Sequence, residues 1–312
     1  MLKIIFTSSI SFCGRRTVFT RLDGLDDVSL LFVIFFFFNF RISEESKSDE
    51  AEAGEGEDDD GGWRVIGEHA IALEGPCTIE RVGGDGLTEK DFLRRYANSK
   101  PVIIEGVRNG WLRKRCRREA MLAEWHAVPV VLTSANTYSY KKVETTFGHY
   151  VQRLLRAQNL STLGNETLYL FGDIDQTLWK PLLDDYIRPR WTIPGYGQAL
   201  SFGVAAVGTG VPFHFHGPGF GEVIFGAKRW FLYPEHRRPR WDPDKSTLQW
   251  YSEVLPTVSV KERPLDCLLK PGELIYFPDK WWHATLNAKT SVFISTFLSP
   301  LNGRNVHEMN EL

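Results

Sequence analysis

Hydrophobic positions repeat at helical spacing in parts of the first half of the chain and at strand spacing in the second. Thr88 can cap a helix that runs through Tyr96, because Phe92, Leu93 and Tyr96 form an apolar stripe. From about Leu200 the chain is dominated by short strands with glycine and proline turns. Two further helices are predicted over residues 118–125 and 147–156, and earlier strands over 102–104, 128–133 and 168–171.

This order of elements predicts an α+β fold with an antiparallel sheet or barrel. No break in composition divides residues 75–300, so we expect one domain over 63–300 and a polar tail over 301–312. Hydrophobic residues make up 43% of the chain, which is enough for a sizeable core.

The most hydrophobic segment, residues 28–40, lies near the N-terminus. As a helix it would span roughly 20 Å, against about 30 Å of bilayer core, which is short for an anchor and typical of a signal-peptide core. We therefore expect a signal peptide or a signal-anchor-like segment over residues 1–43, and no stable membrane span. An uncleaved anchor, a buried strand or a wrongly assigned start are the alternatives.

An acidic, glycine-rich stretch follows over residues 44–62. Residues 44–60 hold ten acids against Lys47 alone, so this stretch repels itself and buries little apolar surface. It is predicted to be a disordered linker. The whole chain carries a net charge of only -2, and the remainder is too weakly basic to indicate a nucleic-acid partner.

Three features besides the N-terminal segment bear on the compartment. Asn159-Leu160-Ser161 and Asn165-Glu166-Thr167 are N-glycosylation sequons. The last four residues, Met309-Asn310-Glu311-Leu312, approximate the Lys-Asp-Glu-Leu retention signal, although the first two positions depart from it. Together these features predict a glycoprotein of the endoplasmic reticulum lumen.

The cysteines fit that compartment without defining a pairing. No Cys-x-x-Cys pair is present among Cys13, Cys77, Cys116 and Cys267, which argues against a structural zinc site. If Cys13 is removed with a targeting segment, the other three permit one disulfide and one free thiol. The sequence does not select the pair.

Candidate chemistry begins at His214 and His216. In a strand, residues i and i+2 face the same side, so both imidazoles project to one face and Phe215 to the other. Neutral imidazole is the commonest side-chain ligand of first-row metals. An isolated His-x-His pattern is nevertheless more often a pair of hydrogen-bonded histidines than a metal site.

The segments that follow give this pair its context. Residues 222–234 read as a strand, a glycine turn and a second strand. In residues 270–285 a Pro-Gly turn leads into an apolar strand, and the next strand begins with Trp-Trp-His. Residues 291–297 alternate with period two and complete the set.

This combination resembles the JmjC family of Fe(II)- and 2-oxoglutarate-dependent oxygenases over roughly residues 88–299. The specific parts are Gly-Thr-Gly before His-x-His, Gly-x-Lys-Arg-Trp-x-Leu-Tyr-Pro after it, and Pro-Gly-Glu-x-x-Tyr-x-Pro-x-x-Trp-Trp-His at the end. Within the family the chain is most similar to a small endoplasmic-reticulum member. The resemblance implies a double-stranded β-helix, a cupin-like jelly-roll barrel, with N-terminal helices packed on it.

The resemblance also implies roles for individual residues. The family's metal ligands, His, Asp or Glu, and His, fall on His214, His216 and His283. Lys228 falls where a lysine pairs the distal carboxylate of 2-oxoglutarate, and Thr296 where some relatives have a polar residue that touches this cosubstrate. The expected walls of the pocket are Trp281 and Trp282.

The histidine at position 216 departs from the family pattern. With Fe(II) and dianionic 2-oxoglutarate, a three-histidine site is neutral where the usual site has a charge of -1, so binding is not forbidden but the electronics of the iron change. Three histidines are also the ligands of a catalytic zinc site. Glu222 has the sequence parity of Lys228 and is a candidate substitute carboxylate, although an acid at the end of the barrel is the simpler interpretation.

Three functional interpretations follow. The first is a regulatory JmjC barrel that binds other proteins and keeps a degenerate metal site, and the sequence slightly favours it. The second is an active Fe(II)/2-oxoglutarate-dependent protein hydroxylase, and the third is a structural domain stabilised by zinc or iron. Each of the first two predicts a protein partner or a protein substrate, and a lumenal location argues against histone demethylation.

Overall fold

The computed structural model describes residues 9–12, 15–18, 59–134, 141–162, 168–172 and 174–301. The chain divides into two compact units, Met1–Glu57 and Asp58–Leu312. In the first unit, β1 (Ser9–Phe12) and β2 (Arg15–Val18) form an antiparallel hairpin. The second unit contains the predicted barrel and starts slightly earlier than predicted, so residues 59–62 belong to the fold and not to a linker.

Several predictions fall on residues outside this description. They are the hydrophobic run 28–40, the acidic residues 44–58, the sequon at Asn165 and the tail 302–312. Within the described ranges, none of the helices has the length and apolar character needed to cross a bilayer.

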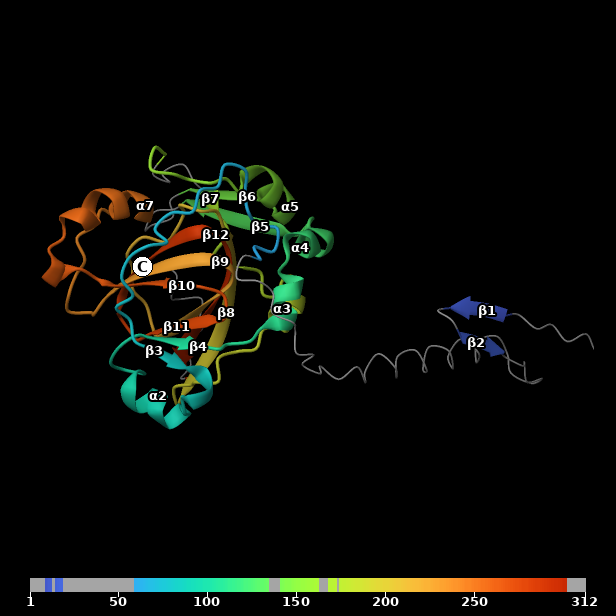
Figure 1. Ribbon diagram of the computed structural model, residues 1–312, viewed down its shortest axis with the longest axis horizontal. Coiled ribbons are helices and arrows are strands. Elements are labelled where there is room, and N and C mark those ends of the chain that lie inside the picture. Colours follow the sequence, from blue (N-terminus) through green and yellow to red (C-terminus); the bar gives the residue numbers. More distant parts are fainter. Residues whose placement is uncertain are drawn as a thin grey trace, which may run out of the picture. The chain divides into compact units, whose positions relative to one another are not determined.

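The second unit is built around one large sheet (Figure 1). Its strands run in the order β3-β4-β11-β9-β12-β8, and β10 also pairs with β9. The bounds are β3 (Arg81–Gly83), β4 (Val102–Glu105), β8 (Tyr196–Ala205), β9 (Gly219–Tyr233), β10 (Leu265–Leu269), β11 (Glu273–Phe277) and β12 (Trp282–Pro300). A smaller sheet has the order β6-β5-β7, with β5 (Pro129–Ser134), β6 (Lys142–Thr146) and β7 (Leu168–Tyr169).

Two long strands form the barrel. β9 and β12 pair antiparallel along nearly their whole lengths. The other edge of β9 pairs first with β11 and then with β10. The other edge of β12 pairs with β8 over residues 291–300, and residues 208–214 continue this edge through backbone hydrogen bonds to residues 283–287. Each long strand therefore serves two halves of the barrel, as the predicted double-stranded β-helix requires.

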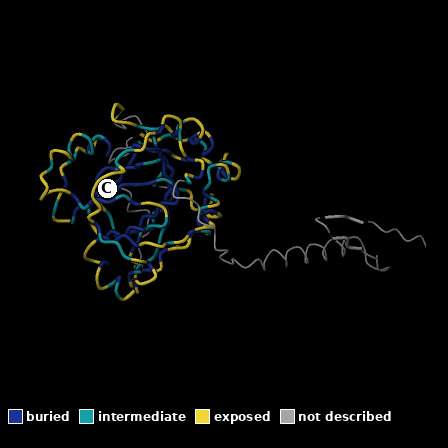
Figure 2. The backbone as a smooth tube through the Cα atoms, in the orientation of Figure 1, coloured by how far each residue is buried: buried dark blue, intermediate teal, exposed yellow. Residues whose placement is uncertain are grey.

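Short helices cover the outside of this barrel (Figure 1). They are η1 (Gly84–Gly86), α2 (Glu89–Arg95), α3 (Gly110–Arg115), α4 (Arg118–Trp125), α5 (Phe147–His149), the π-helix η2 (Tyr150–Leu154), α6 (Lys180–Leu183), α7 (Thr247–Gln249), the π-helix η3 (Trp250–Val254), η4 (Leu255–Thr257) and η5 (Val260–Glu262). One buried cluster joins α3 to α6 with β8, β9 and β12, and a second joins α2 with β4 and β11. Figure 2 shows these buried segments at the centre of the unit.

The predicted elements before residue 200 are largely confirmed. Thr88 caps α2, and its hydroxyl accepts a hydrogen bond of 3.1 Å from the backbone of Asp91. The helix predicted over 147–156 is a single α-turn followed by the π-helix η2. α3 and β6 were not predicted, because the basic run in α3 masks its buried residue Leu112 and β6 has little apolar alternation.

Two glycines allow strands to approach or kink. A Cβ at Gly210 would overlap the carbonyl oxygen of Thr285, so residues 208–214 can lie against β12 only with glycine at this position. Gly226 has a positive φ of 85°, and a Cβ there would overlap the backbone of Thr290. The pairing of β9 with β12 shifts register around Gly226, which is a β-bulge region.

The segment before β3, residues 72–77, is held against β9 and β10 by hydrogen bonds and a disulfide. Arg229 is 1% exposed, forms an ion pair of 2.7 Å with Asp266, and donates hydrogen bonds to the carbonyl oxygens of Ala72, Glu74 and Pro76. Next to them, a disulfide joins Cys77 to Cys267 on β10, and Cys116 is a buried free thiol. The structure thereby identifies the pair that the sequence left open.

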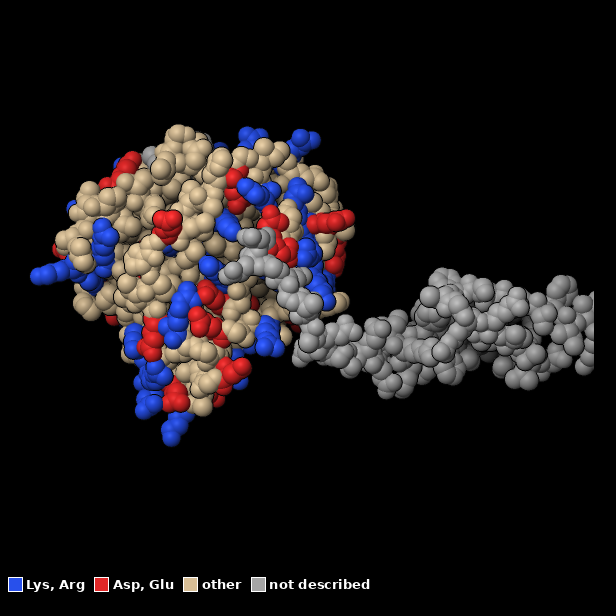
Figure 3. Space-filling model, viewed as in Figure 1, with Lys and Arg blue, Asp and Glu red and all other residues tan. Residues whose placement is uncertain are grey.

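Surface charges of the second unit are mixed in sign. On the face seen in Figure 3, basic and acidic side chains lie side by side around α2. There Arg94 pairs with Asp91, and both Arg95 and Lys100 pair with Glu80. Such interspersed pairs agree with the weak net charge.

Candidate metal centre

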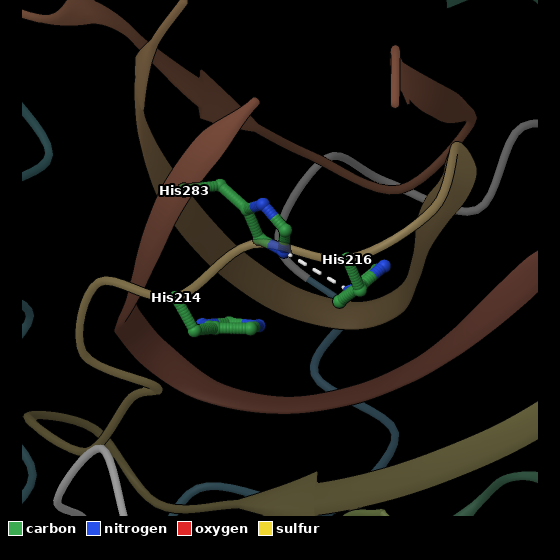
Figure 4. A group of neighbouring side chains, drawn as sticks. All are labelled: His214, His216 and His283. Atoms are coloured by element: carbon green, nitrogen blue, oxygen red, sulfur yellow. Dashed lines mark hydrogen bonds between the residues drawn. The ribbon is translucent and has the colours of Figure 1, made fainter. Parts of the chain in front are cut away.

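The three predicted ligands lie close together (Figure 4). Their ligand nitrogens all lie within 4.8 Å of one another, and the Nε2 atoms of His216 and His283 are 3.2 Å apart. His214 and His283 are partners in an antiparallel bridge, with backbone hydrogen bonds of 3.1 and 2.9 Å between them. The strand pairing itself therefore brings residues from distant parts of the sequence together.

Each imidazole is oriented by a backbone carbonyl. The Nδ1 atoms of His214, His216 and His283 lie 2.8 Å from the carbonyl oxygens of Pro212, Gly217 and Trp281 respectively. A carbonyl oxygen can only accept a hydrogen bond, so each Nδ1 must carry the proton. All three Nε2 atoms then present lone pairs, which is the tautomer that ligates a metal through Nε2.

Burial keeps the three rings in the neutral form. It lowers the pKa of His214, lowers the pKa of His216 to about 3 with a contribution from His214, and lowers the pKa of His283 well below its ordinary value. Two neutral rings with facing Nε2 lone pairs at 3.2 Å repel each other unless a cation lies between them.

The spacing of these nitrogens suits a small divalent ion. Ligand bonds of about 2.0–2.1 Å in a tetrahedral site place two nitrogens roughly 3.3 Å apart. The 3.2 Å between the Nε2 atoms of His216 and His283 is close to this value. The ligand nitrogen of His214 lies within 4.8 Å of the other two, so a small shift of its ring completes the site. The residues present therefore fit a metal ion held by three imidazoles.

The histidines open into a cavity of about 410 Å³. Lys228 lines the same cavity and is 4% exposed, with its Nζ 3.1 Å from the centre of the Phe293 ring. Among the described residues, no carboxylate forms an ion pair with Lys228, and burial lowers its pKa well below 10.5. A buried ammonium without an anionic partner is costly, so the cavity is suited to an anionic ligand.

Glu222 does not provide a substitute carboxylate. It is 3% exposed and accepts a hydrogen bond of 2.8 Å from Asn109, on the side of β9 that packs under the helices. Its neighbours in alternation, Phe220 and Ile224, belong to the buried clusters under those helices. The bulge near Gly226 reverses the alternation, so the side chains of Glu222 and Lys228 leave β9 on opposite faces despite their even spacing. Glu222 still borders the cavity, but among the described residues only the three histidines form the ligand cluster.

The prediction for Thr296 also needs correction. Ser295 and Phe297 line the cavity, and alternation along β12 turns Thr296, which is 1% exposed, to the opposite face. Thr296 therefore does not make the cosubstrate contact expected for it. Ser295 is the polar side chain of this strand that reaches the cavity.

The two tryptophans before His283 are not the walls of the cavity. Trp282 packs against Phe215 and Trp241, with ring centres 4.6 and 5.1 Å away, and its indole nitrogen donates to the carbonyl oxygen of Glu235. Trp281 packs against the buried cluster of β4, β9, β10 and β11. Trp230 and Phe277 are the lining residues whose rings pack beside His283, at 6.0 and 4.5 Å from its ring, and Phe171, Phe215, Phe293 and Phe297 also line the cavity.

These wall residues carried a signal in the sequence. Trp230 is two positions from Lys228 and therefore shares its face of β9, and Phe277 ends the apolar strand before the Pro-containing turn. Strand alternation counted from Lys228 would have identified Trp230, whereas the prediction selected the adjacent pair Trp281 and Trp282.

Comparison with known proteins agrees with the geometry. A family model described as JmjC domain matches residues 220–306. JmjC domain-containing protein 8 of Homo sapiens is 49% identical over 242 residues, which cover 77% of this chain and 91% of that protein. The protein of the same name from Rattus norvegicus is 50% identical over 243 residues, covering 77% and 90%. The bifunctional arginine demethylase and lysyl-hydroxylase psr-1 of Caenorhabditis elegans is 23% identical over 278 residues, covering 75% and 65%.

Proposed function

The chain belongs to the JmjC-domain family, and from its site we propose that it is a secretory-pathway protein hydroxylase that uses Fe(II) and 2-oxoglutarate. One observation carries this proposal: three inward lone pairs share one cavity with the buried amine of Lys228, which has no carboxylate partner among the described residues. The family typically depends on these two cofactors, and a relative's name describes lysyl hydroxylation.

The roles of the chain's own residues follow from their positions. His214, His216 and His283 would hold the metal through Nε2, while the carbonyl groups behind them fix the rings. Lys228 would bind the distal carboxylate of 2-oxoglutarate, because the compact point charge of an ammonium suits a carboxylate. Trp230 and Phe277 would exclude water around the ligands. When bound, Fe(II) and 2-oxoglutarate supply the oxidising chemistry of hydroxylation.

The secretory location rests on two features of the described residues. The disulfide between Cys77 and Cys267 favours an oxidising compartment. Asn159 is exposed, and its side-chain oxygen accepts hydrogen bonds from Ser161 in a surface turn, where glycosylation enzymes can reach it. Both features support a lumenal location.

A second candidate, favoured by His216 in place of the family's carboxylate, is the regulatory barrel that binds protein partners without turnover. The sequence alone slightly favours this function. The geometry supports an enzyme instead, because burying Lys228 and the facing imidazoles destabilises the folded protein unless bound ligands interact with them. Zinc is the alternative metal, since it also binds three imidazoles.

The test uses the full-length protein loaded with Fe(II), and measures bound metal and succinate released from 2-oxoglutarate. We expect metal binding and turnover, both lost in His283→Ala and kept in His236→Ala, which removes an exposed histidine. Metal binding without turnover would leave a structural metal domain, and turnover gained in His216→Asp would identify the histidine at this position as the cause of the lost activity. A folded protein with neither metal binding nor turnover would overturn the hydroxylase and leave the regulatory barrel.

A further inference from the structure

The disulfide between Cys77 and Cys267 has an unusual neighbour for a structural crosslink. Arg81, on β3, places Nε 3.4 Å from Sγ of Cys77 and Nη2 3.4 Å from Sγ of Cys267. A guanidinium therefore donates toward both sulfurs at once. On reduction, these contacts become charge-assisted hydrogen bonds to a thiolate.

Arg81 is held in this position by other groups. Its Nη1 pairs with the carboxylates of Glu105 and Glu273, and its Nη2 also donates to the carbonyl oxygen of Leu268 at 3.1 Å. These carboxylates weaken its positive field but fix the direction of its remaining donors. The guanidinium is thus preorganised toward the sulfurs before any reaction occurs.

The two sulfurs differ in accessibility. Cys77 lies in an exposed segment, whereas Cys267 is 1% exposed and lies on β10 within a buried cluster. A thiolate from solution can approach along the S–S axis only at Cys77, which makes Cys267 the leaving group. Cys116 cannot act as an internal nucleophile, because it is buried and its burial raises the thiol pKa to about 12.

We propose that this disulfide is a thiol–disulfide exchange site that reacts with an external dithiol at Cys77 and expels Cys267 as a thiolate stabilised by Arg81. The incoming sulfur forms a bond to Sγ of Cys77 while the Cys77–Cys267 bond breaks toward Sγ of Cys267. The second thiol of the reagent then attacks the mixed disulfide and releases Cys77. The dithiol is oxidised by two electrons, and its two protons pass to the released cysteines.

β10 connects the exchange site to the cavity. Cys267 pairs with Trp230, and Leu269 pairs with Lys228, in the register of β10 and β9. Trp230, Leu269 and Lys228 all line the cavity. Release of Cys267 removes the covalent attachment of the strand next to the ligand-binding lysine.

The first experiment measures the rate at which dithiothreitol reduces the folded full-length protein at pH 7, with alkylation and intact mass as readout. An opposite charge within about 4–6 Å lowers a leaving thiol's pKa by about 1–3 units, so with a sensitivity near 0.5 we expect Arg81→Gln to react roughly three- to thirtyfold more slowly. Arg81→Lys should recover part of the rate. Arg95→Gln, which removes an exposed arginine paired with Glu80, should react at the wild-type rate.

Further measurements define the direction and the consequence of the reaction. After a short exposure to reduced glutathione and an acid quench, peptide mapping should find the adduct on Cys77. Hydrogen exchange should show lost protection over residues 71–79 and 265–269 after reduction. An unchanged or faster rate in Arg81→Gln, an adduct on Cys267, or unchanged protection would overturn the proposal. None of these readouts requires metal or turnover, so they are independent of the proposed hydroxylase function.

Discussion

Replacement of Glu222 by glutamine should stabilise the protein at neutral pH. Glu222 is 3% exposed, and burial raises its carboxyl pKa from 4.5 to about 7, although Asn109 and Tyr186 partly offset the burial. The unfolded chain releases the proton near pH 4.5 and the folded chain only near pH 7. Between these values the folded state binds more protons, so its stability falls as the pH rises.

The size of this effect follows from the two pKa values. One pH unit corresponds to about 1.4 kcal/mol, so raising the pKa to about 7 costs the folded state about 3 kcal/mol at pH 8 relative to pH 4. Glutamine keeps an oxygen that can accept the hydrogen bond from Asn109 and carries no charge to desolvate. The free energy of unfolding of Glu222→Gln should therefore be close to that of wild type at low pH and higher by about 3 kcal/mol at pH 8.

Urea unfolding of the full-length protein at half-unit steps from pH 4.5 to 8 measures this difference directly. Glu144→Gln removes an exposed acid on β6 and controls for the loss of a surface charge. The quantity of interest is the variant's free energy of unfolding minus that of wild type. If that difference stays constant across the range, the buried carboxyl does not titrate as inferred and the reasoning is refuted.

Three other perturbations test the site, the backbone and the compartment. Lys228→Met should weaken 2-oxoglutarate binding roughly 100-fold in calorimetry. It should also raise the free energy of unfolding at neutral pH, because burial lowers the pKa of Lys228 and the wild type recovers this stability only as the pH rises toward 10. Lys245→Met, at a lysine whose side chain is 43% exposed, is the control, and unchanged binding in Lys228→Met would contradict the assigned role. Gly210→Ala should cost roughly 3 kcal/mol in chemical unfolding, whereas Gly83→Ala, with no atom near its added Cβ, should cost little. Asn159→Gln should remove one glycosidase-sensitive mobility shift after expression through a secretory pathway, and an unshifted wild type would count against lumenal exposure at this sequon.

The clustering of the three histidines was predictable because their positions follow local rules. His214 and His216 are separated by one residue, and His283 opens a strand after a turn, so each position carried its own signal. The bridge between His214 and His283 was not visible in the sequence. It depends on the close approach at Gly210, which no periodicity reports.

Predictions failed where a single irregular position changes which face of the strand the following side chains occupy. The bulge near Gly226 reverses the faces of β9, so the even spacing of Glu222 and Lys228 was misleading. Neighbouring residues of β12 face opposite sides of the strand, so the prediction of Thr296 in place of Ser295 selected a side chain on the wrong face. The pairing of Cys77 with Cys267 spans 190 residues and depends on how the N-terminal segment crosses β10.

One feature of the ligand arrangement affects how such a site can change its chemistry. His214 and His283 are partners in an antiparallel bridge, whereas His216 lies outside that bridge, with its carbonyl oxygen accepting a hydrogen bond from the backbone of Lys280. An exchange of the donor at position 216 therefore leaves the strand architecture untouched. A barrel of this kind can acquire a different ligand field through one codon, while its other two ligands are protected by the fold that presents them.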